Sequence, residues 1–424
     1  MRIQQFLPDG TIAHHDSLKP ILDGLEKSKV YLHTRKASDL LDYFDIAGEQ
    51  LLKNPFTQRM DGVMFLSSWL KRKHMEEVVK RSLGNDPIIL DEFIPIGTRR
   101  FLTAKPQGTV CMWMAGNVVT LPMFSFIPSL ITKNVTLLKL ADGNATEMHA
   151  VLALLASIKT ETVDGAELMK SLAVIWFDYT DRSINEAMSL AADAKVMWGG
   201  EAAIKGITSL PRYEHCKEIV YGPKYSFGVI SRNHIESATG LDSTVTAFIR
   251  DSAIFDQRGC SSPQIVFIEK NNKYTLKELA EKFAAAYRRL PPKPDLDAYT
   301  TVRIVNIRAE YALDPNRDVI ASEDGANWTL LLDNTPELKE AIQSRTLYLT
   351  EVNSWHEIIP LINPKVQTIG IAFDTTEEAL EFADAASLAG AVRCVRPGLM
   401  NVHDYPWDGK YLINELVRWI DVKH

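Results

Sequence analysis

The sequence predicts an α/β protein built on parallel sheets. Short, apolar strand-like runs alternate with helix-like stretches from Gly108 onward, and the same alternation restarts after about residue 220. In such βαβ units a helix connects two strands that run in the same direction. The chain has 424 residues, of which 46% are hydrophobic, so it can bury cores in two or three lobes. We therefore expect two parallel-sheet α/β domains.

Helical patterns fill the beginning of the chain. Residues 36–53 and 62–81 carry apolar side chains at three- and four-residue spacing, which is the repeat of an amphipathic helix. We therefore expect residues 1–95 to form a helical lead-in that packs on the following domain.

Strand-like runs define a first sheet domain, which we place at residues 96–220. A helix from Ala145 to Ser157 separates two of these runs, and Asn144 is suited to cap its N-terminus. The last run ends in Gly199-Gly200, where a turn into another helix is expected. The runs are 109–114, 135–140, 172–177 and 194–198.

A second sheet domain is expected at residues 221–395. Its clearest helix begins with a capping box, in which Thr275 and Glu278 satisfy each other's backbone N–H groups, and it ends before a proline-rich segment at 291–294. The closing segment, 396–424, is rich in apolar residues that we expect to return to the first domain or to meet another subunit. The predicted strands of this domain are 227–231, 264–269 and 366–373, and a helix is predicted at 376–387.

Composition excludes several classes of protein. The four cysteines are too few and too widely spaced for a disulfide framework or a zinc site, so a reducing cytoplasm fits best and no metal is expected. The N-terminus does not resemble a signal peptide, and no run approaches the length of a membrane span. A formal net charge of -7 with interspersed signs provides no basic surface for nucleic acid.

Common nucleotide and hydrolase motifs are missing. The sequence has no GxGxxG after a strand, no Walker A loop, no HExxH and no GxSxG, which argues against the corresponding fold families. Gly199-Gly200, followed by Gly206, remains as a place where a phosphate could approach the backbone at a strand-to-helix junction. The alternative is that these glycines only make a tight turn.

The segment 255–267 holds the strongest candidate for chemistry. Cys260 lies in a turn of small residues just before a strand-like run, and Gly259 allows a close backbone approach. A cysteine placed there could attack a carbonyl carbon and donate its own N–H to the resulting oxyanion. The alternative is a buried structural cysteine, because free thiols behave as small hydrophobes.

Five segments occur in one order between about residues 80 and 410, and together they resemble a known superfamily. They are Gly108-Thr109-Val110 through Ala115-Gly116-Asn117, Lys133 through Leu140, Val196-Met197-Trp198-Gly199-Gly200, Gln257-Arg258-Gly259-Cys260, and Arg396-Pro397-Gly398 with Asn401 and Pro406 through Lys410. In this order they resemble the aldehyde dehydrogenase superfamily, and more closely its LuxC-type acyl-CoA reductase branch. The resemblance implies an aldehyde-dehydrogenase-like fold with a cofactor domain, a catalytic domain and a small oligomerisation element.

The resemblance implies roles for individual residues. Cys260 matches the nucleophile that becomes acylated, and Asn117 matches the amide that completes the oxyanion hole. Arg258 is the nearest cation in sequence, so the group that activates the thiol is left open. Candidates for a proton donor are His215, His234, His356 and His403, each with a structural role as the alternative.

The implied cofactor residues lie mainly in the first domain. Lys139 matches a lysine that contacts the adenosine ribose, and Gly199 and Gly200 match the turn that meets the pyrophosphate. Asp142 falls near the acidic position that biases the family toward or away from a 2′-phosphate, and its shorter side chain would leave room for NADPH, with NADH as the alternative. Glu351 is the candidate to replace a glutamate that contacts the nicotinamide ribose.

One departure from the acid-forming dehydrogenases has a chemical meaning. Those enzymes carry a Glu-Leu-Gly-Gly-Lys segment whose glutamate activates water, and Val220 stands in its place here. Valine cannot accept a proton, so an acyl group on Cys260 would persist until a hydride or another thiol removes it.

The activity that the resemblance implies is NADPH-dependent reduction of an acyl thioester, with a long-chain fatty acyl group, to the aldehyde. The donor is expected to be acyl-CoA or an acyl-protein, and the resemblance also implies a homo-oligomer with acyltransferase and acyl-protein synthetase partners. Three alternatives stay open: an aryl or short functionalised acyl reductase, an aldehyde or semialdehyde dehydrogenase, and a non-catalytic scaffold that binds acyl-protein partners.

Overall fold

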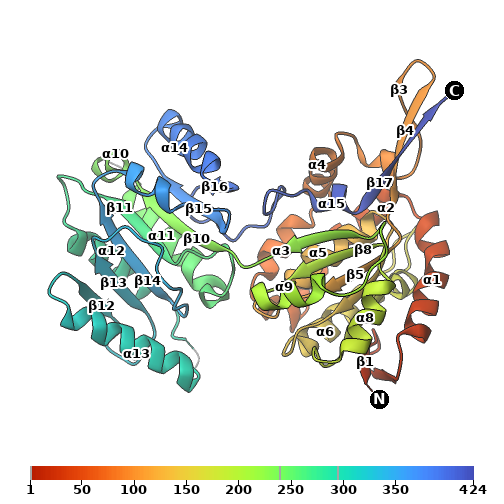
Figure 1. Cartoon of the computed structure of the whole chain (residues 1–424), viewed down its shortest axis with the longest axis horizontal. Helices are drawn as coiled ribbons and strands as arrows, with labels where there is room; N and C mark the ends of the chain where they lie inside the picture. Colours follow the sequence, from red (N-terminus) through yellow and green to blue (C-terminus); the bar gives the residue numbers. More distant parts are fainter. Residues whose placement is uncertain (1, 238–239, 294–295) are drawn as a thin grey trace. The chain divides into compact units, whose positions relative to one another are not determined.

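The structure is a computed structural model that describes residues 2–237, 240–293 and 296–424. The chain divides into two compact units (Figure 1). Unit 1 comprises Met1–Gly222 and His403–His424, and unit 2 comprises Pro223–Val402. The closing segment therefore joins unit 1 from His403, whereas the sequence analysis began it at residue 396.

The central sheet of unit 1 has the strand order β2-β1-β7-β6-β5-β8-β9. Its strands from β7 to β9 run parallel to one another, and the central ones are buried on both faces, as expected where helices cover a sheet. The strands are β1 (Ile3–Phe6), β2 (Ile12–His15), β5 (Thr109–Trp113), β6 (Val135–Lys139), β7 (Leu172–Trp176), β8 (Ala194–Trp198) and β9 (Lys217–Tyr221).

The prediction of a wholly helical lead-in was wrong at its beginning. Strands β1 and β2 form a hairpin, and β1 extends the main sheet by pairing antiparallel with β7. The turn contains Asp9-Gly10, with Gly10 at φ 85°, and such a pair between strands is a known hairpin signal. The strands have only four residues each, which gave little alternation to detect.

Helices cover the sheet of unit 1 (Figure 1). The pattern predicted over 62–81 is divided into two helices, because Lys71 has an extended ψ of 128°. Asn144 does occupy the N-cap of its helix, but its side chain makes no capping hydrogen bond. The helices are α1 (Lys19–Thr34), α2 (Ala37–Lys53), α3 (Val63–Trp69), α4 (Arg72–Leu83), α5 (Leu121–Ile131), α6 (Ala145–Ser157), α7 (Gly165–Leu168), α8 (Arg182–Leu190), α9 (Glu201–Thr208) and α15 (Leu412–Glu415).

A small separate sheet also belongs to unit 1, with the strand order β17-β4-β3. The C-terminal β17 (Val417–Lys423) pairs antiparallel with β4 (Arg100–Pro106), which pairs with β3 (Ile94–Gly97). Most side chains of β17 are exposed, so this strand lies at the surface, whereas Trp407, Leu412 and Leu416 of the closing segment are buried.

The sheet of unit 2 has the strand order β12-β13-β14-β11-β10-β15-β16. All neighbouring strands are parallel except β12, which pairs antiparallel with β13. The strands are β10 (Tyr225–Ile230), β11 (Ile265–Glu269), β12 (Asp318–Ala321), β13 (Thr329–Asp333), β14 (Thr346–Val352), β15 (Val366–Ala372) and β16 (Arg393–Val395).

The two faces of this sheet carry different cores, because side chains alternate along each strand. Val266 and Ile268 of β11 pack with α11 and α12, whereas Ile265 and Phe267 pack with α13 and α14. Unit 2 is therefore a three-layer α/β unit around its own core. Its helices are α10 (Arg232–Glu236), α11 (Leu241–Ala253), α12 (Leu276–Tyr287), α13 (Ala298–Leu313) and α14 (Thr376–Leu388).

Candidate functional site

The connections in unit 1 place a topological switch point at the carboxyl ends of β5 and β8. From β5 the chain proceeds outward through β6 and β7, and it then returns to the other side of β5 as β8. At such a switch point the two loops turn away from each other, which is where open α/β sheets bind ligands. The predicted residues of unit 1 lie at the carboxyl ends of three neighbouring strands: Asn117 after β5, Lys139 and Asp142 at the end of β6, and Gly199 and Gly200 after β8.

The glycines at this edge allow the backbone to come close to a ligand. A Cβ added to Gly116 would lie 3.0 Å from Ala141 Cβ, so the loops after β5 and β6 touch there. Gly200 is the N-cap of α9, and a Cβ added to it would have no atom within 4 Å. Open space before the N-terminus of a helix suits a phosphate, because unpaired N–H groups point toward it.

Lys139 ends β6 with its ammonium group largely inside the protein. Its Nζ lies 5.0 Å from the ring centre of Phe177 and donates to the Leu140 carbonyl at 3.3 Å. Burial lowers the pKa of Lys139, and the nearby carboxylates of Asp142 and Asp178 oppose that shift. Asp142 accepts a hydrogen bond of 2.6 Å from Trp176 Nε1, which ties its carboxylate to the end of β7.

Val220, which replaces the water-activating glutamate of the acid-forming enzymes, lies on strand β9. Val220 is half-buried and pairs with Met197 of β8. The acidic residue of this strand, Glu218, lies 3.5 Å from the fully buried Lys195 and 3.3 Å from Arg212. Its charge is therefore committed to structural ion pairs.

In unit 2, Cys260 lies in the turn before β11 and is half-buried. Ser226 Oγ of the neighbouring β10 donates a hydrogen bond of 2.7 Å to the Cys260 carbonyl. A Cβ added to Gly259 would lie 3.1 Å from Ser262 Oγ and 3.2 Å from Asn401 Oδ1, so a larger residue there would have to displace these side chains by a few tenths of an ångström. Sequence reasoning missed Ser226, because a serine inside a strand has no local signal for this contact.

Amide side chains hold both ends of the turn. Gln257 Nε2 donates to the carbonyls of Pro263 and Thr346, each at 3.0 Å. Gln264 Nε2 donates a hydrogen bond of 3.2 Å to the Gln257 carbonyl. These bonds connect the turn to the amino ends of β11 and β14 and satisfy buried backbone groups that would otherwise be costly.

The other cysteines are less suited to act as nucleophiles: Cys111 and Cys216 are buried, and Cys394 is half-buried. Burial raises the pKa of the thiols of Cys111 and Cys216, and it raises that of Cys394 to about 11. A thiol in an apolar environment ionises poorly and is a weak nucleophile. Cys260 therefore remains the strongest candidate among the cysteines.

The histidine candidates have structural surroundings. His234 and His356 follow the carboxyl ends of β10 and β14, the sheet edge opposite to the Cys260 turn, and bond Thr244 and Ser354 at 2.8 Å. Burial lowers the pKa of His234. His215 is exposed, with its Nε2 3.4 Å from Asp193.

His403 belongs to a buried aromatic cluster in unit 1. Its ring centre lies 4.3 Å from Phe124 and 4.5 Å from Trp407, and Trp69 and Tyr405 complete the cluster. This packing gives His403 a structural position, which is the alternative role that the sequence left open.

Glu351 is not brought to the nucleophile. It is near the carboxyl end of β14, and alternation puts its side chain on the face covered by α11 and α12. The part of this region that does meet the Cys260 turn is the segment 343–345, immediately before β14. No local pattern marked that segment in the sequence.

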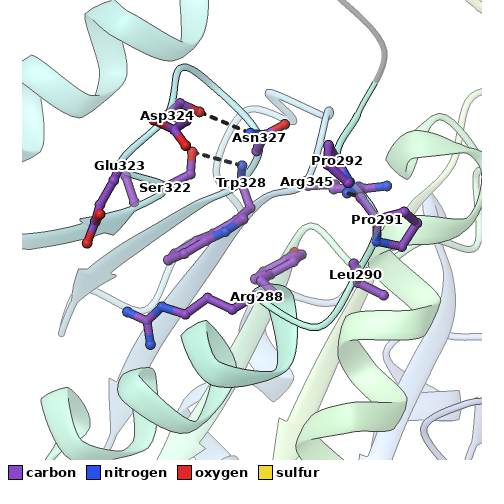
Figure 2. A pocket seen from close by; sticks show the side chains of 12 residues that line it. Arg288, Leu290, Pro291, Pro292, Ser322, Glu323, Asp324, Asn327, Trp328 and Arg345 are labelled. Carbon is purple, nitrogen blue, oxygen red and sulfur yellow. Dashed lines mark hydrogen bonds between the residues drawn. The ribbon is translucent and has the colours of Figure 1, made fainter.

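A surface pocket of about 300 Å³ lies at the same edge of unit 2 (Figure 2). Tyr287 and Trp328 form a parallel stacked pair with ring centres 5.6 Å apart, and the Arg288 guanidinium lies 5.7 Å from the Trp328 ring centre. Arg345 also lines the pocket, and Glu323 and Asp324 supply balancing negative charges on its other side. The pocket therefore favours neither anions nor cations.

Two classes of site are missing from the described residues. In the ranges 2–237, 240–293 and 296–424, no group of three or more His, Cys, Asp and Glu side chains gathers as a metal site requires. Within the same ranges, no helix combines the length and the apolar character needed to cross a membrane.

Comparison with protein families shows what the chain is similar to. The sequence model of the family described as acyl-CoA reductase (LuxC) matches residues 28–419. A long-chain acyl-protein thioester reductase of Photorhabdus laumondii is 25% identical over 436 aligned positions, which cover 96% of this chain and 86% of the relative. The enzyme of the same name from Aliivibrio fischeri is also 25% identical, over 77% of this chain and 65% of its own length.

Two solved dehydrogenase structures share the fold of this chain. The Δ-pyrroline-5-carboxylate dehydrogenase of Mycobacterium tuberculosis aligns with a TM-score of 0.71 at 11% identity, covering 99% of this chain and 89% of that one. An NADP-dependent glyceraldehyde-3-phosphate dehydrogenase from Bacillus halodurans, complexed with NADP, aligns with a TM-score of 0.67 at 13% identity, covering 100% and 96%. These likenesses confirm the predicted aldehyde-dehydrogenase-like fold.

Proposed function

Because this chain belongs to the acyl-CoA reductase (LuxC) family, we propose that it reduces an acyl thioester to an aldehyde through an acyl group on Cys260. The observation that carries the proposal is the turn before β11. It presents a half-buried cysteine on a backbone anchored by Ser226 and Gln257. Burial raises the pKa of the other three thiols, which disfavours their thiolate form.

The residues of the chain account for the first half of the reaction. The Cys260 thiolate forms a bond to the thioester carbonyl carbon, and the carbon–sulfur bond to the donor breaks, so the donor leaves as a thiol after it takes up a proton. During the attack, the Cys260 N–H and the Asn117 amide are proposed to stabilise the negative oxygen. Val220 offers no base to activate water, which protects the acyl group from hydrolysis.

A nicotinamide cofactor is proposed to bind at the switch point of unit 1. Gly200 leaves open space at the N-terminus of α9, which suits a pyrophosphate, and Lys139 supplies a cation at the end of β6 for the adenosine ribose. When bound, the cofactor supplies the hydride that converts the acyl carbon to the aldehyde and frees Cys260.

We propose NADPH in preference to NADH. The Asp142 carboxylate is engaged by Trp176 Nε1 at 2.6 Å, which reduces its capacity to accept hydrogen bonds from a free ribose 2′-hydroxyl. Competition between the two cofactors, followed by fluorescence, tests this choice. Preference for NADH would reject it.

The proposed donors are a long-chain acyl-protein or acyl-CoA. The relatives from Photorhabdus laumondii and Aliivibrio fischeri are named long-chain acyl-protein thioester reductases, which supports the first. Acyltransferase and acyl-protein synthetase partners remain part of the proposal.

A homo-oligomer is proposed from the small sheet β17-β4-β3. Its strands and the segment before them expose large apolar side chains that a partner subunit could cover, and sedimentation velocity tests this. They are Phe93, Ile96, Phe101, Trp419 and Val422.

The proposed activity is tested by intact-mass spectrometry after incubation with a panel of acyl-CoAs and acylated carrier proteins. Cys260→Ser is the test variant. Cys394→Ser is its matched control, since Cys394 is a half-buried thiol of the same unit. We expect the wild type and the control to gain one acyl mass, and NADPH then to remove it with release of aldehyde.

Other outcomes would favour the alternatives. An acyl mass on Cys260→Ser would place the nucleophile elsewhere. Release of free acid would indicate an oxidising or hydrolytic enzyme, and binding of acyl-protein without any covalent adduct would indicate a scaffold.

A further inference from the structure

The backbone just before the nucleophile has an unusual conformation. Residues 255–257 all have positive φ, between 50° and 59°, and so do residues 343–345, between 55° and 68°. None of these six residues is glycine. Left-handed backbone is strained for such residues, and it persists where the surrounding structure holds it in place.

Asp256 connects the two left-handed segments. Its carbonyl accepts a hydrogen bond of 3.1 Å from the Ser344 N–H, and its carboxylate Oδ2 accepts one of 2.9 Å from Ser344 Oγ. Its other carboxylate oxygen, Oδ1, lies 2.9 Å from Lys293 Nζ. One side chain therefore joins three segments that are far apart in sequence.

The ion pair between Lys293 and Asp256 is mostly shielded from solvent. Its side chain is 4% exposed, and that of Asp256 is 27% exposed. Burial lowers the pKa of Lys293, Asp256 opposes the shift, and the positive charges of Arg345 and Arg258 lower it further. Asp256 is thus the carboxylate that balances several cations around the loop.

Cys260 follows Asp256 by four residues, and the chain between them is fixed at several points. Gln257 bonds the Pro263 and Thr346 carbonyls, and the Arg258 N–H donates to the Phe255 carbonyl at 2.9 Å. A change in the backbone at Asp256 would therefore be transmitted to the cysteine.

We propose that Asp256, Lys293 and Ser344 are positioning residues that set the orientation of Cys260 for attack on the thioester. This inference rests on the proposed function, in which Cys260 is the nucleophile. The three residues act on the sulfur through the backbone and touch no reacting atom. A reaction geometry wrong by about 1 Å commonly costs a factor of about 100 in rate.

The test compares Asp256→Ala with Asp256→Asn. Asparagine tolerates left-handed backbone and keeps an acceptor for Ser344 Oγ, whereas alanine loses both properties. We expect Asp256→Ala to lower the single-turnover acylation rate of Cys260 by about 100-fold, with the thioester KM changed by less than about threefold. The acylation rate of Asp256→Asn is expected to be at least about tenfold higher than that of Asp256→Ala.

Lys293→Met is the second variant, and it keeps the test decisive if Asp256→Ala does not fold. It removes the ion pair without touching the left-handed backbone directly, and we expect it to slow acylation by about tenfold. A wild-type acylation rate in Lys293→Met would overturn the proposal.

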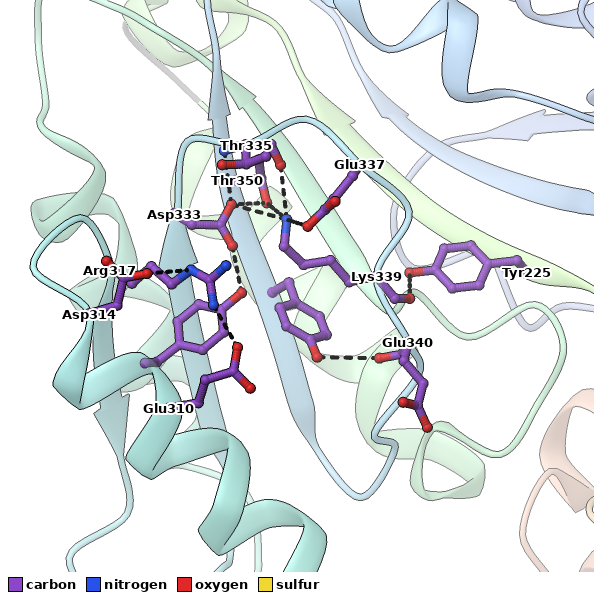
Figure 3. Close-up of polar contacts among 12 residues, drawn as sticks. Tyr225, Glu310, Asp314, Arg317, Asp333, Thr335, Glu337, Lys339, Glu340 and Thr350 are labelled. Atoms are coloured by element: carbon purple, nitrogen blue, oxygen red, sulfur yellow. Dashed lines mark hydrogen bonds and ion pairs between the residues drawn. The ribbon is translucent and has the colours of Figure 1, made fainter.

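Asp333→Ala is the matched control, because it breaks a comparable buried ion pair of the same unit (Figure 3). Asp333 lies 3.1 Å from Lys339 Nζ and accepts bonds from Tyr311 at 2.6 Å and from Thr350 at 3.0 Å. It ends β13, at the carboxyl edge, away from the Cys260 turn. We expect it to lower Tm but to leave the acylation rate per folded molecule unchanged. An equal loss of rate in this control would show that general destabilisation explains the effect.

Alkylation of Cys260 by iodoacetamide separates the two proposals, because it needs no thioester substrate. If no thioester acylates the wild type, the proposed function fails. The positioning role then stands if Asp256→Ala changes the alkylation rate by about tenfold or more relative to Asp256→Asn, and it fails if the two variants react alike.

Discussion

Asn401 donates a hydrogen bond of 2.7 Å from its side-chain amide to the backbone carbonyl of Asp251. Its carbonyl oxygen accepts hydrogen bonds from Ser261 at 2.9 Å and from Ser262 at 3.2 Å, the two residues that follow Cys260. Asn401 thus links α11 to the nucleophile turn, although it lies near the end of the unit 2 sequence. Its side chain is buried, so each of these groups depends on it.

Removing this amide should affect both stability and reactivity. We expect Asn401→Ala to lower the free energy of unfolding by about 2 kcal/mol or more, because it leaves buried polar groups without their hydrogen-bond partner. We also expect it to slow acylation of Cys260. Urea unfolding and single-turnover acylation measure the two effects. The matched control is Asn353→Ala, whose exposed amide bonds Glu357 at 2.9 Å, and it should cost less than about 0.5 kcal/mol. Equal losses in the two variants would contradict this role.

The carboxyl group of Asp251 should make stability depend on pH. Burial raises its pKa from 3.8 to about 7, although N–H groups from Gly398, Met400 and Asn401 and the charge of Arg393 oppose the shift. Between these two pH values the folded protein binds a proton that the unfolded chain does not. The contribution of Asp251 is therefore complete below about pH 4 and is lost as the pH rises through about 7.

Asp251→Asn should remove this dependence, because asparagine does not titrate yet still accepts the Gly398 N–H bond. Urea unfolding from pH 4 to pH 8 should show a decline in the wild type, of roughly 4 kcal/mol as an upper limit, that is absent in the variant. The comparison variant is Asp318→Asn, because the bond to Lys277 lowers the pKa of Asp318. If both variants decline like the wild type, Asp251 is not the titrating group.

Gly200→Ala should separate cofactor binding from stability. Its φ of -69° suits alanine, and no atom lies within 4 Å of the added Cβ, so the fold should tolerate it. The methyl group would occupy the space proposed for the pyrophosphate, and we expect NADPH to bind at least about tenfold more weakly. Fluorescence titration measures this. Gly206→Ala, later in α9, should leave affinity unchanged, and unchanged affinity in both would remove Gly200 from the site.

Val220→Glu should open a hydrolytic route. If residue 220 stands where acid-forming relatives activate water, the new carboxylate should shorten the lifetime of the acyl-enzyme by about tenfold or more in the absence of NADPH. Time-resolved intact mass and detection of the free acid would show it. Val220→Gln has the same size without the base and should keep the wild-type lifetime. Equal lifetimes in the two variants would mean that residue 220 does not face the acyl group.

Local patterns predicted structural features whose residues are close in sequence. The small-residue turn at 259–262 and the capping box of Thr275 with Glu278 are visible in a few consecutive residues, and the structure contains both. The hairpin around Gly10 and the strand β13 were missed, because four or five residues carry too little periodicity. Glu351 was predicted to replace a cofactor-contacting glutamate in a segment where the family's motif is not recognisable, and its position on β14 is near the sheet edge opposite to the Cys260 turn.

The sequence by itself determined the alternation of strands and helices, the family resemblance and the choice of Cys260, because each depends on residue types at short spacing. Only the tertiary structure decided what holds that cysteine. Ser344 reaches Asp256 across 88 residues, and Asn401 reaches Ser261 across 140. Such contacts arise from how parallel strands are ordered in the sheet, and the pairing of distant strands leaves no signal in either segment alone.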